Sequence, residues 1–374
     1  MFAGAPQVVP CDQHLDSALE EVHPGSAVFV LRLRDGEPYL GRTGVLRRRL
    51  KRLLRQRDNP GRLLNLRGRA EQIELWPAGS RLETSLVLYE LARQLLPGRY
   101  LEFLKLQMPY YVKLVLGNNY PRTMVTPRIG GSASLNYGPF RSRAAAEQFE
   151  HACLDLFQLR RCQEDLTPTP DHPGCIYGEM NMCLRPCQGA VTPDEYASEA
   201  NRVQEFLLTE GKLSVASAAA ARDRLSAELE FEDAAREHRR MEKIEAAVSL
   251  RDELARPAER TDGIAVVPSH REHEAVLFPM RSGCWTGPLR IDVGGGAGES
   301  LDSRLKQAVT ATAADIAADA SDRAEHLALL ARWAYSSYCD GTWIPINDPS
   351  RVPWRRLVAA LSRHVHHSGA AASH

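Results

Sequence analysis

Apolar residues in the first part of the chain follow the spacing of strands and of one amphipathic helix. The run AVFVLRL at 27–33 is apolar and β-branched, a turn follows at Asp35-Gly36, and Tyr39 lies in the next short apolar segment. This order is typical of a β-hairpin. Residues 44–57 carry leucines at helical spacing, which predicts an amphipathic helix. The leucines of that apolar stripe are Leu46, Leu50, Leu53 and Leu54.

Two further segments complete a small N-terminal unit. The alternating run AEQIELW at 70–76 predicts a third strand. Residues 83–98 predict a helix, which Pro97-Gly98 would end. Strands and helices in this order predict a small α/β domain within residues 1–104.

The middle of the chain predicts a second hairpin and then mostly helices. Segments 110–117 and 123–129 read as two strands joined by a turn, and 142–161 reads as a helix. Thr192-Pro193-Asp194-Glu195 has the pattern of a capping box with proline at the first helical position. Helices should continue to about residue 256, with a turn near 229–232. The mixed charges of 222–256 suit an exposed helical hairpin.

Strand patterns return after residue 262. The runs GIAVVPS, EAVLFPM and LRIDV predict three strands, and 303–340 is mostly helical in pattern. We expect the end of the chain, 347–374, to be disordered. Its histidines are then part of a tail and not a metal site.

Four of the eight cysteines lie within 26 residues, in a segment broken by proline and glycine. Four thiolates on one loop match the ligand count of an iron–sulfur cluster or a closed zinc site. Disulfides and buried thiols are the alternatives. Cys153, on the apolar side of the preceding helix, is expected only to pack. The four clustered cysteines are Cys162, Cys175, Cys183 and Cys187.

Charge is unevenly distributed, although the net charge is zero. Residues 31–70 hold thirteen Arg or Lys against three acids. Such an excess favours a polyanionic partner, with DNA as the default, and an ordinary solvated surface is the alternative. No apolar run suits a secretory signal or a membrane span, so we expect a cytoplasmic protein without a membrane partner.

Four blocks, in order over 25–250, resemble the N-terminal half of the UvrC excinuclease family. AVFVLRLRDGEPYLGRTGVLRRRL is similar to the GIY-YIG nuclease motif, and NYGPFRSRAAAEQF is similar to the block that follows it in UvrC. The cysteine loop with CLRPCQG has a spacing close to that of the UvrC cluster. LEFEDAAREHRRMEKI resembles the UVR helical hairpin, which binds UvrB.

The resemblance implies an α/β multidomain chain whose first domain has a three-stranded antiparallel sheet with helices. A truncated RNase H-like remnant would follow the hairpin, without that domain's catalytic acids. The expected parts are a GIY-YIG domain at 1–104, a β-hairpin linker at 105–149, a cysteine-rich region at 150–191, a helical region with the hairpin at 192–256, the remnant at 257–346 and the tail at 347–374.

The family's site roles can be carried over onto matching residues. Glu90 matches the ligand of Mg²⁺ (or Mn²⁺), Arg49 the catalytic arginine, and Tyr39 and Gly41 the second half of the motif. Arg49 also lies beside the leucine stripe, where a charged side chain needs a partner in the protein or a bound ligand. Arg42 stands where the family has lysine. DNA-binding residues would be Arg47, Arg48, Lys51, Arg52 and Arg55.

The resemblance also implies partner and cluster residues. Leu229, Phe231, Ala234 and Ala235 would form the turn and packing face toward UvrB. The four clustered cysteines would hold a [4Fe–4S] cluster, with Zn²⁺ as the alternative.

This chain departs from the family at polar positions of the site. Phe29 replaces the first motif tyrosine, Leu53 another tyrosine and Leu101 an asparagine. Losing positioning groups commonly lowers a rate by orders of magnitude. The sequence thus favours a UvrC-like endonuclease that makes one incision, on the 3′ side. A non-catalytic DNA- and UvrB-binding adaptor is the rival, and a stand-alone GIY-YIG nuclease is a third alternative.

Overall fold

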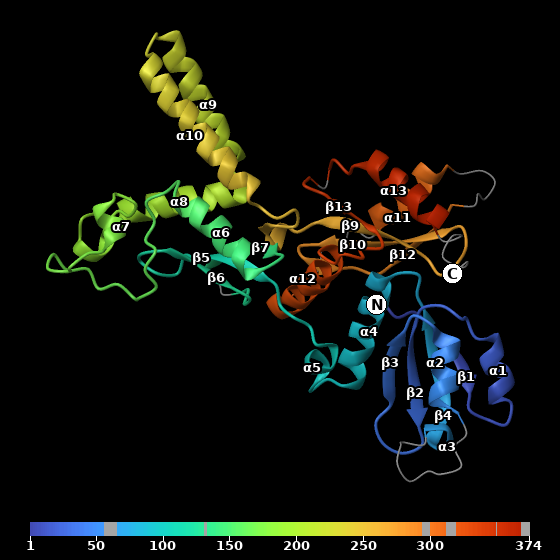
Figure 1. Cartoon of the computed structure of the whole chain (residues 1–374). Helices are drawn as coiled ribbons and strands as arrows, with labels where there is room; N and C mark the ends of the chain where they lie inside the picture. The colour runs from blue at the N-terminus through green and yellow to red at the C-terminus, as the bar shows by residue number, and fades with distance from the viewer. Residues whose placement is uncertain (56–65, 131–132, 294–299, 312–318, 349, 368–374) are drawn as a thin grey trace. The chain divides into compact units, whose positions relative to one another are not determined.

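The computed structural model describes residues 1–374 except 56–65, 131–132, 294–299, 312–318, 349 and 368–374 (Figure 1). The chain forms two compact units. The first contains 1–106, 262–317 and 332–374, and the second contains 107–261 and 318–331. No helix among the described residues has both the length and the apolar character needed to cross a bilayer.

The sheet of residues 1–106 is antiparallel, as expected, but has four strands where three were predicted. The additional strand, β1, pairs with β4 from Gln7↔Leu75 to Pro10↔Gln72. The predicted hairpin is confirmed, with Leu31 opposite Tyr39. In spatial order the strands are β1 (Gln7–Pro10), β4 (Ala70–Pro77), β2 (Ala27–Leu33) and β3 (Tyr39–Thr43).

Helices surround this sheet. The predicted helix over 44–57 is shorter in the structure, where α2 ends at Leu53. Leu46 and Leu50 of α2 are fully buried in the sheet's core, as the leucine spacing predicted. The helices are α1 (Leu15–Glu21), α2 (Leu46–Leu53), α3 (Leu66–Arg69), α4 (Arg81–Leu95) and α5 (Tyr100–Leu104).

The second unit is built on another antiparallel sheet. The predicted hairpin is confirmed as β5 and β6, and its core continues into the following helix, α6 (Arg143–Leu154). The helix is shorter than the predicted 142–161. In spatial order the strands are β6 (Arg122–Thr126), β5 (Tyr110–Val115), β7 (Ser134–Phe140) and β8 (Arg256–Pro257).

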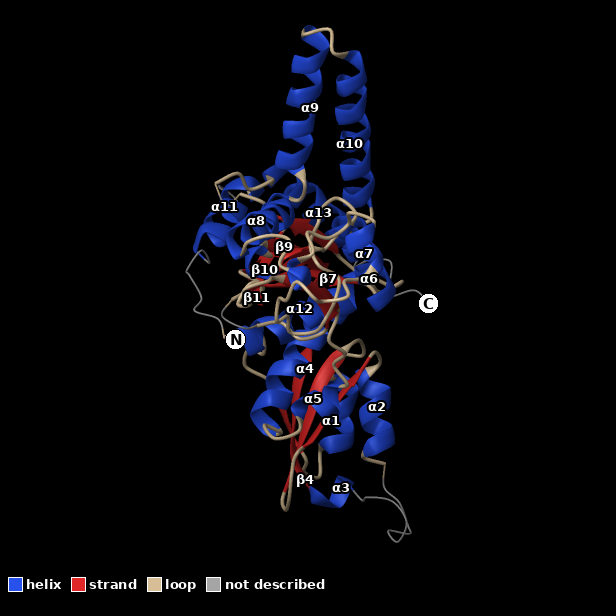
Figure 2. Cartoon of the chain, turned by 90° about the vertical axis from the view of Figure 1, so that its left-hand side faces the viewer, coloured by secondary structure: helices blue, strands red, loops and turns tan. Residues whose placement is uncertain are grey.

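Helices follow the cysteine segment, as predicted. The capping box at Thr192 is confirmed, because its side chain and that of Glu195 each accept the other residue's backbone N–H. Figure 2 shows α9 and α10 side by side as a projecting hairpin. The elements are α7 (Ile176–Glu179), the 3₁₀ turn η1 (Pro186–Gln188), α8 (Pro193–Thr209), α9 (Lys212–Ala227) and α10 (Phe231–Ser249).

The later part of the chain adds a five-stranded sheet to the first unit. Its central strands, β9 and β10, are buried along most of their length and match two of the predicted runs. LRIDV is also confirmed as a strand, β12. The order is β11 (Cys284–Trp285), β10 (Glu274–Arg281), β9 (Gly263–Pro268) and β13 (Thr342–Pro345), with β12 (Leu289–Asp292) also paired to β10.

The predicted helical stretch contains two helices, and a third lies in the segment expected to be disordered. That expectation is wrong for α13, because Leu357 and Leu361 are fully buried against the sheet and His364 lies 2.9 Å from the Thr342 hydroxyl. Residues 368–374 lie outside the described residues. The helical elements are η2 (Ala258–Arg260), α11 (Leu301–Ala311), α12 (Ala320–Ala334) and α13 (Trp354–His367).

Candidate functional site

The predicted tyrosine and arginine meet at the edge of the first sheet. Arg49 lies on α2 beside the buried Leu50 and is itself half-buried. Its Nη2 donates a hydrogen bond to the Tyr39 hydroxyl at the start of β3, at 3.2 Å. This contact explains why a guanidinium lies beside an apolar stripe. The pair joins a cation and a phenol, two groups that phosphodiester chemistry uses.

Phe29 fills the space that Gly41 leaves open. The two residues are opposite each other on β2 and β3, and Phe29 is fully buried. Its ring centroid lies 6.0 Å from that of Tyr39. A Cβ atom at Gly41 would lie 2.8 Å from the Phe29 Cζ atom, so only glycine fits beneath the ring. Phe29 therefore packs beside the predicted site and offers no hydroxyl to it.

Replacing Gly41 with alanine should destabilise the N-terminal sheet by about 1–3 kcal/mol, because a buried ring has little room to move. Gly44→Ala is the matched control, since nothing lies within 4 Å of its Cβ position. Denaturant unfolding of both variants measures the difference. Equal midpoints for the two variants would contradict the packing argument.

Glu90 is held by backbone N–H groups from the start of the chain. Phe2 and Ala3 donate to its Oε2 at 2.5 and 2.6 Å, and the Met1 amine also contacts it. Its side chain is 15% exposed. No hydrogen bond or ion pair of the described residues joins Glu90 to Tyr39 or Arg49.

The helix that carries Glu90 is anchored by a buried carboxylate. Glu83 is 2% exposed and accepts from the Gly79 N–H at 2.9 Å and from Arg290 of β12 at 2.6 Å. Burial raises the pKa of Glu83, and the charge of Arg290 opposes that rise. Ser80, the residue before α4, also caps the helix by accepting the Glu83 N–H. Residues after 262 thus help to fix α4, a role that no sequence motif indicated.

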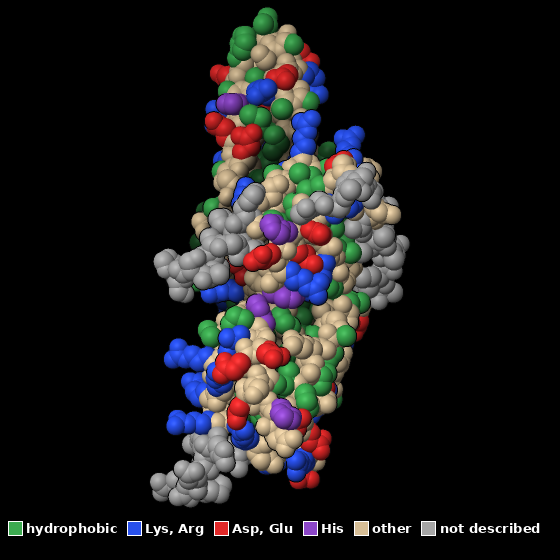
Figure 3. All heavy atoms as spheres, turned by 90° about the vertical axis from the view of Figure 1, so that its right-hand side faces the viewer, with side chains coloured by type: hydrophobic (Ala, Val, Ile, Leu, Met, Phe, Trp, Pro, Cys, Tyr) green, Lys and Arg blue, Asp and Glu red, His purple; other side chains and the backbone are tan. Residues whose placement is uncertain are grey.

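The structure divides the predicted DNA-binding residues into two groups. Arg47 donates to the Val22 carbonyl at 2.9 and 3.2 Å, and Lys51 pairs with Glu20, so both tie α2 to α1. The other three are exposed and have no partner among the described residues. Figure 3 shows Lys and Arg side chains projecting from one edge near the bottom of the view. The exposed members are Arg48, Arg52 and Arg55.

Arg42, which replaces the family lysine, also faces other cations. Partial desolvation, and then the charges of Arg332 and Arg81, lower its pKa. Three guanidinium groups thus raise the local positive potential near β3, which favours a phosphate there. Of the other two departures from the family, Leu53 is half-buried on α2 and Leu101 is 38% exposed on α5.

The four clustered cysteines are free thiols, which removes the disulfide alternative from this structure. Cys183 and Cys187 are buried, Cys162 is half-buried and Cys175 is exposed. Burial raises the pKa of Cys183 to about 11, the Arg185 N–H opposes this, and the other three thiols raise it further. The Cys183 sulfur therefore lies within electrostatic reach of the other three. Among the residues that the structure describes, no three His, Cys, Asp or Glu side chains have the arrangement of a metal site.

Donors already point at two of these sulfurs. The Arg185 N–H donates to Cys183 Sγ at 3.4 Å, and Arg160 Nη1 lies 3.6 Å from Cys162 Sγ. Arg160 is 2% exposed, and its backbone N–H donates to the Tyr196 hydroxyl at 2.9 Å. Such donors stabilise thiolates. Sequence reasoning missed Arg160 and Tyr196, whose role depends on contacts between distant segments.

The tip of the α9–α10 hairpin exposes two large apolar side chains. Leu229 is 71% and Phe231 63% exposed, and Leu229 has a left-handed backbone with φ of 65°. Ala234 is buried within the hairpin and Ala235 faces solvent. Of the predicted partner residues, Leu229, Phe231 and Ala235 are therefore accessible. Cys153, as predicted, packs in the core of its unit.

Comparisons with known proteins agree with the resemblance. Residues 110–206 match the family described as "UvrC/Cho excinuclease, middle domain". This range contains all four clustered cysteines. No solved structure matches the chain.

Most of the chain is similar to curated proteins named UvrABC system protein C. The one from Desulforudis audaxviator is 26% identical over 286 residues, covering 75% of this chain and 46% of that protein. The one from Lachnospira eligens is 22% identical over 303 residues, covering 79% and 49%. The chain thus spans about half the length of the curated relatives it matches.

Proposed function

We propose that this protein is a cytoplasmic DNA endonuclease of nucleotide excision repair, of the UvrC type. The observation that carries the proposal is the hydrogen bond between Tyr39 and Arg49, in a chain similar to UvrABC system protein C along most of its length. Two residues that the motif places ten positions apart meet at one site.

The finer proposal is a GIY-YIG nuclease that makes a single incision on the 3′ side of a lesion. UvrB would recruit it through the α9–α10 hairpin. The exposed Leu229 and Phe231 support this part, because apolar side chains at a projecting tip suit a protein interface. Residues 257–346 would supply contacts that support the nuclease helix, such as Arg290 to Glu83.

In this proposal each site residue has a separate task. Glu90 would hold Mg²⁺ or Mn²⁺, an ion that keeps most of its waters and so needs few protein ligands. The ion would supply charge stabilisation at the scissile phosphate. Arg49 would stabilise the charge that develops on the phosphate, and Tyr39 would orient the attacking water. The Glu90 carboxylate already accepts the N–H groups of Phe2 and Ala3 on one oxygen and contacts the Met1 amine with the other, so the ion would bind beside these donors.

The cysteines would hold a [4Fe–4S] cluster, with Zn²⁺ as the alternative. We assign the group a structural task, because the segment 162–187 has only short helices and leaves Ile176 and Met180 exposed. The ligands would be Cys162, Cys175, Cys183 and Cys187.

A second candidate is an adaptor that binds DNA and UvrB without cutting. Two observations favour it: Phe29 is buried where the family has a tyrosine, and Glu90 is already occupied by backbone donors. Both features would be expected of a site that no longer hydrolyses phosphodiesters.

A nicking assay separates the two candidates. The purified protein is incubated with UvrA, UvrB, ATP, Mg²⁺ and a duplex that carries one lesion. An endonuclease produces one cut on the 3′ side of the lesion. UvrB binding without any cut would establish the adaptor instead.

Removing two exposed cations of α2 should weaken DNA binding. Arg48→Ala with Arg52→Ala should lower the slope of log affinity against log salt by about two, roughly one for each phosphate that the protein no longer neutralises. Lys51→Ala is the control on the same helix and should change the slope less, because Glu20 already pairs with that lysine. Titrations of a labelled duplex at several salt concentrations measure the slopes. An unchanged slope in the double variant would remove α2 from the interface.

A further inference from the structure

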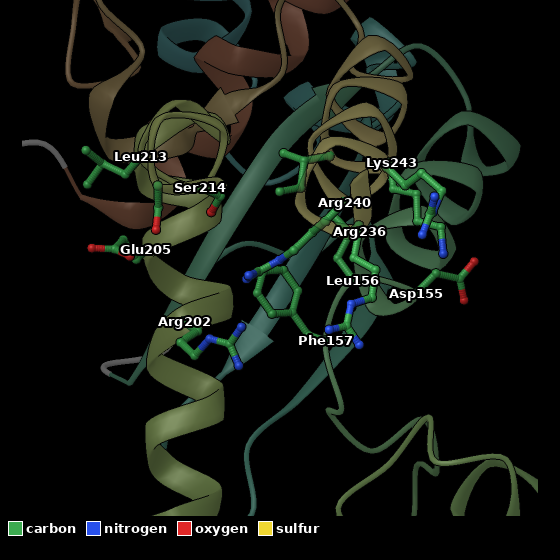
Figure 4. Close-up of a pocket in the computed structure, with 13 residues that line it drawn as sticks. Asp155, Leu156, Phe157, Arg202, Glu205, Leu213, Ser214, Arg236, Arg240 and Lys243 are labelled. Atoms are coloured by element: carbon green, nitrogen blue, oxygen red, sulfur yellow. The ribbon is translucent and has the colours of Figure 1, made fainter. Parts of the chain in front are cut away.

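The second unit contains a pocket that the proposed nuclease chemistry does not use. It lies at the base of the helical hairpin and has a volume of about 510 Å³, within the range of small-ligand sites. Figure 4 shows its walls, which come from α8, the start of α9, α10 and the loop after α6.

Basic side chains dominate this pocket, which has five cations against two acids. One of the acids, Asp155, is already paired with Arg161 at 2.6 Å. Arg202 is also paired, with Glu199 at 2.6 Å, so the positive charge left for a bound anion lies on α10. The cations are Arg202 of α8 and Arg236, Arg239, Arg240 and Lys243 of α10.

Two of the cations are unengaged. Arg239 and Lys243 are exposed and form no ion pair among the described residues. Arg236 and Arg240 pair with acids three residues earlier on their own helix, and both side chains are more than half exposed. Exposed pairs of this kind contribute little free energy, so either guanidinium can turn to a ligand.

An apolar wall lies beside the cations. Phe157 is only 8% exposed, with the Arg202 guanidinium 5.6 Å from its ring centroid, and Figure 4 shows Arg240 extending into the same cavity from α10. Leu213, 52% exposed, lies on the opposite wall beside the Ser214 hydroxyl. An apolar surface next to guanidinium groups suits a ligand with a planar apolar face and a phosphate.

We propose that this pocket binds single-stranded nucleic acid, with phosphates on Arg239 and Lys243 and one base against the exposed Leu213. Base stacking and phosphate contacts supply most of the binding free energy when proteins bind single-stranded nucleic acid. An acidic protein segment could also use the cations, and the test below separates it from nucleic acid. The inference is independent of the nuclease proposal, because it concerns binding in another unit of the chain.

The test is a titration of the full-length protein with labelled oligothymidylate, without added divalent metal. Lys243→Glu and Arg239→Glu should each weaken binding roughly tenfold or more, since each removes a charged hydrogen-bond donor. Each should also lower the salt slope by about one. Arg224→Glu is the matched control, because Arg224 is exposed on α9, has no ion pair among the described residues and does not line the pocket.

Three outcomes decide the proposal. Loss of binding in the two pocket variants, with Arg224→Glu like wild type and circular dichroism unchanged in all, supports it. Equal affinities in the pocket and control variants overturn it. It is also overturned if the pocket variants keep their affinity for oligothymidylate but no longer bind a labelled oligoglutamate peptide. That result would assign the pocket to an acidic protein segment. Glu90→Ala should bind oligothymidylate like wild type, so this test and the nicking assay can fail separately.

Discussion

Serine at both Cys183 and Cys187 should abolish the proposed metal binding and destabilise the second unit by on the order of 5–10 kcal/mol, since structural metal sites contribute folding free energy directly. Both side chains are buried, and only the short elements α7 and η1 order the segment around them. Cys183 lies within electrostatic reach of the other three thiols, but no three ligand side chains of the described residues have the arrangement of a metal site. We therefore expect the metal to draw the segment together as it binds.

Elemental analysis and thermal unfolding measure this effect, and the ratio of iron to zinc decides between the two metals. Cys153→Ser is the control, because that thiol is buried in the core and lies outside the cluster. It should cost about 1–3 kcal/mol of stability and leave the metal content unchanged. Hydrogen exchange at residues 162–187 should slow when the metal is bound. Wild-type protein with neither metal at one site per chain would contradict the assignment.

Removing the Glu90 carboxylate should lower the nicking rate by roughly 10²–10³ or more, because the ion it holds stabilises charge in the transition state. Glu90→Gln tests this most cleanly. Its amide oxygen can still accept the N–H groups of Phe2 and Ala3, so the local contacts survive while the negative charge is lost. We expect Glu90→Gln to be as inactive as Glu90→Ala but more stable to denaturant.

A neighbouring carboxylate provides the control. Glu102 is exposed on α5 and has no side-chain partner among the described residues. Glu102→Ala should nick at the wild-type rate. If all three variants nick alike, Glu90 has no part in the chemistry.

Local patterns predicted much of the fold. The hairpin of β2 and β3, the capping box at Thr192 and the strands β9 and β10 follow from short-range spacing and turn residues. Strand β1 was missed, because four residues that end in Pro10 carry too little signal without β4 beside them. Helix α13 could have been found, since Leu357, Ala360 and Leu361 have helical spacing. The histidine-rich end of that segment instead favoured a disordered tail.

Only those contacts of the site that join residues of one short motif could be predicted from the sequence. The unusual place of Arg49 beside a leucine stripe indicated a partner, and Tyr39 is that partner. The contacts of Glu90 with Phe2 and Ala3 join distant parts of the chain, and no local pattern encodes them. The anchoring of Arg47 to Val22 likewise depends on how α1 and α2 pack.

The most direct measurement is the nicking of a lesion-bearing duplex by wild-type protein and by Glu90→Gln, each with UvrA, UvrB, ATP and Mg²⁺. The account predicts one cut, on the 3′ side of the lesion, by wild type and a rate lower by roughly 10²–10³ for the variant. Equal cutting by both proteins, or no cutting by wild type while UvrB still binds, would contradict it.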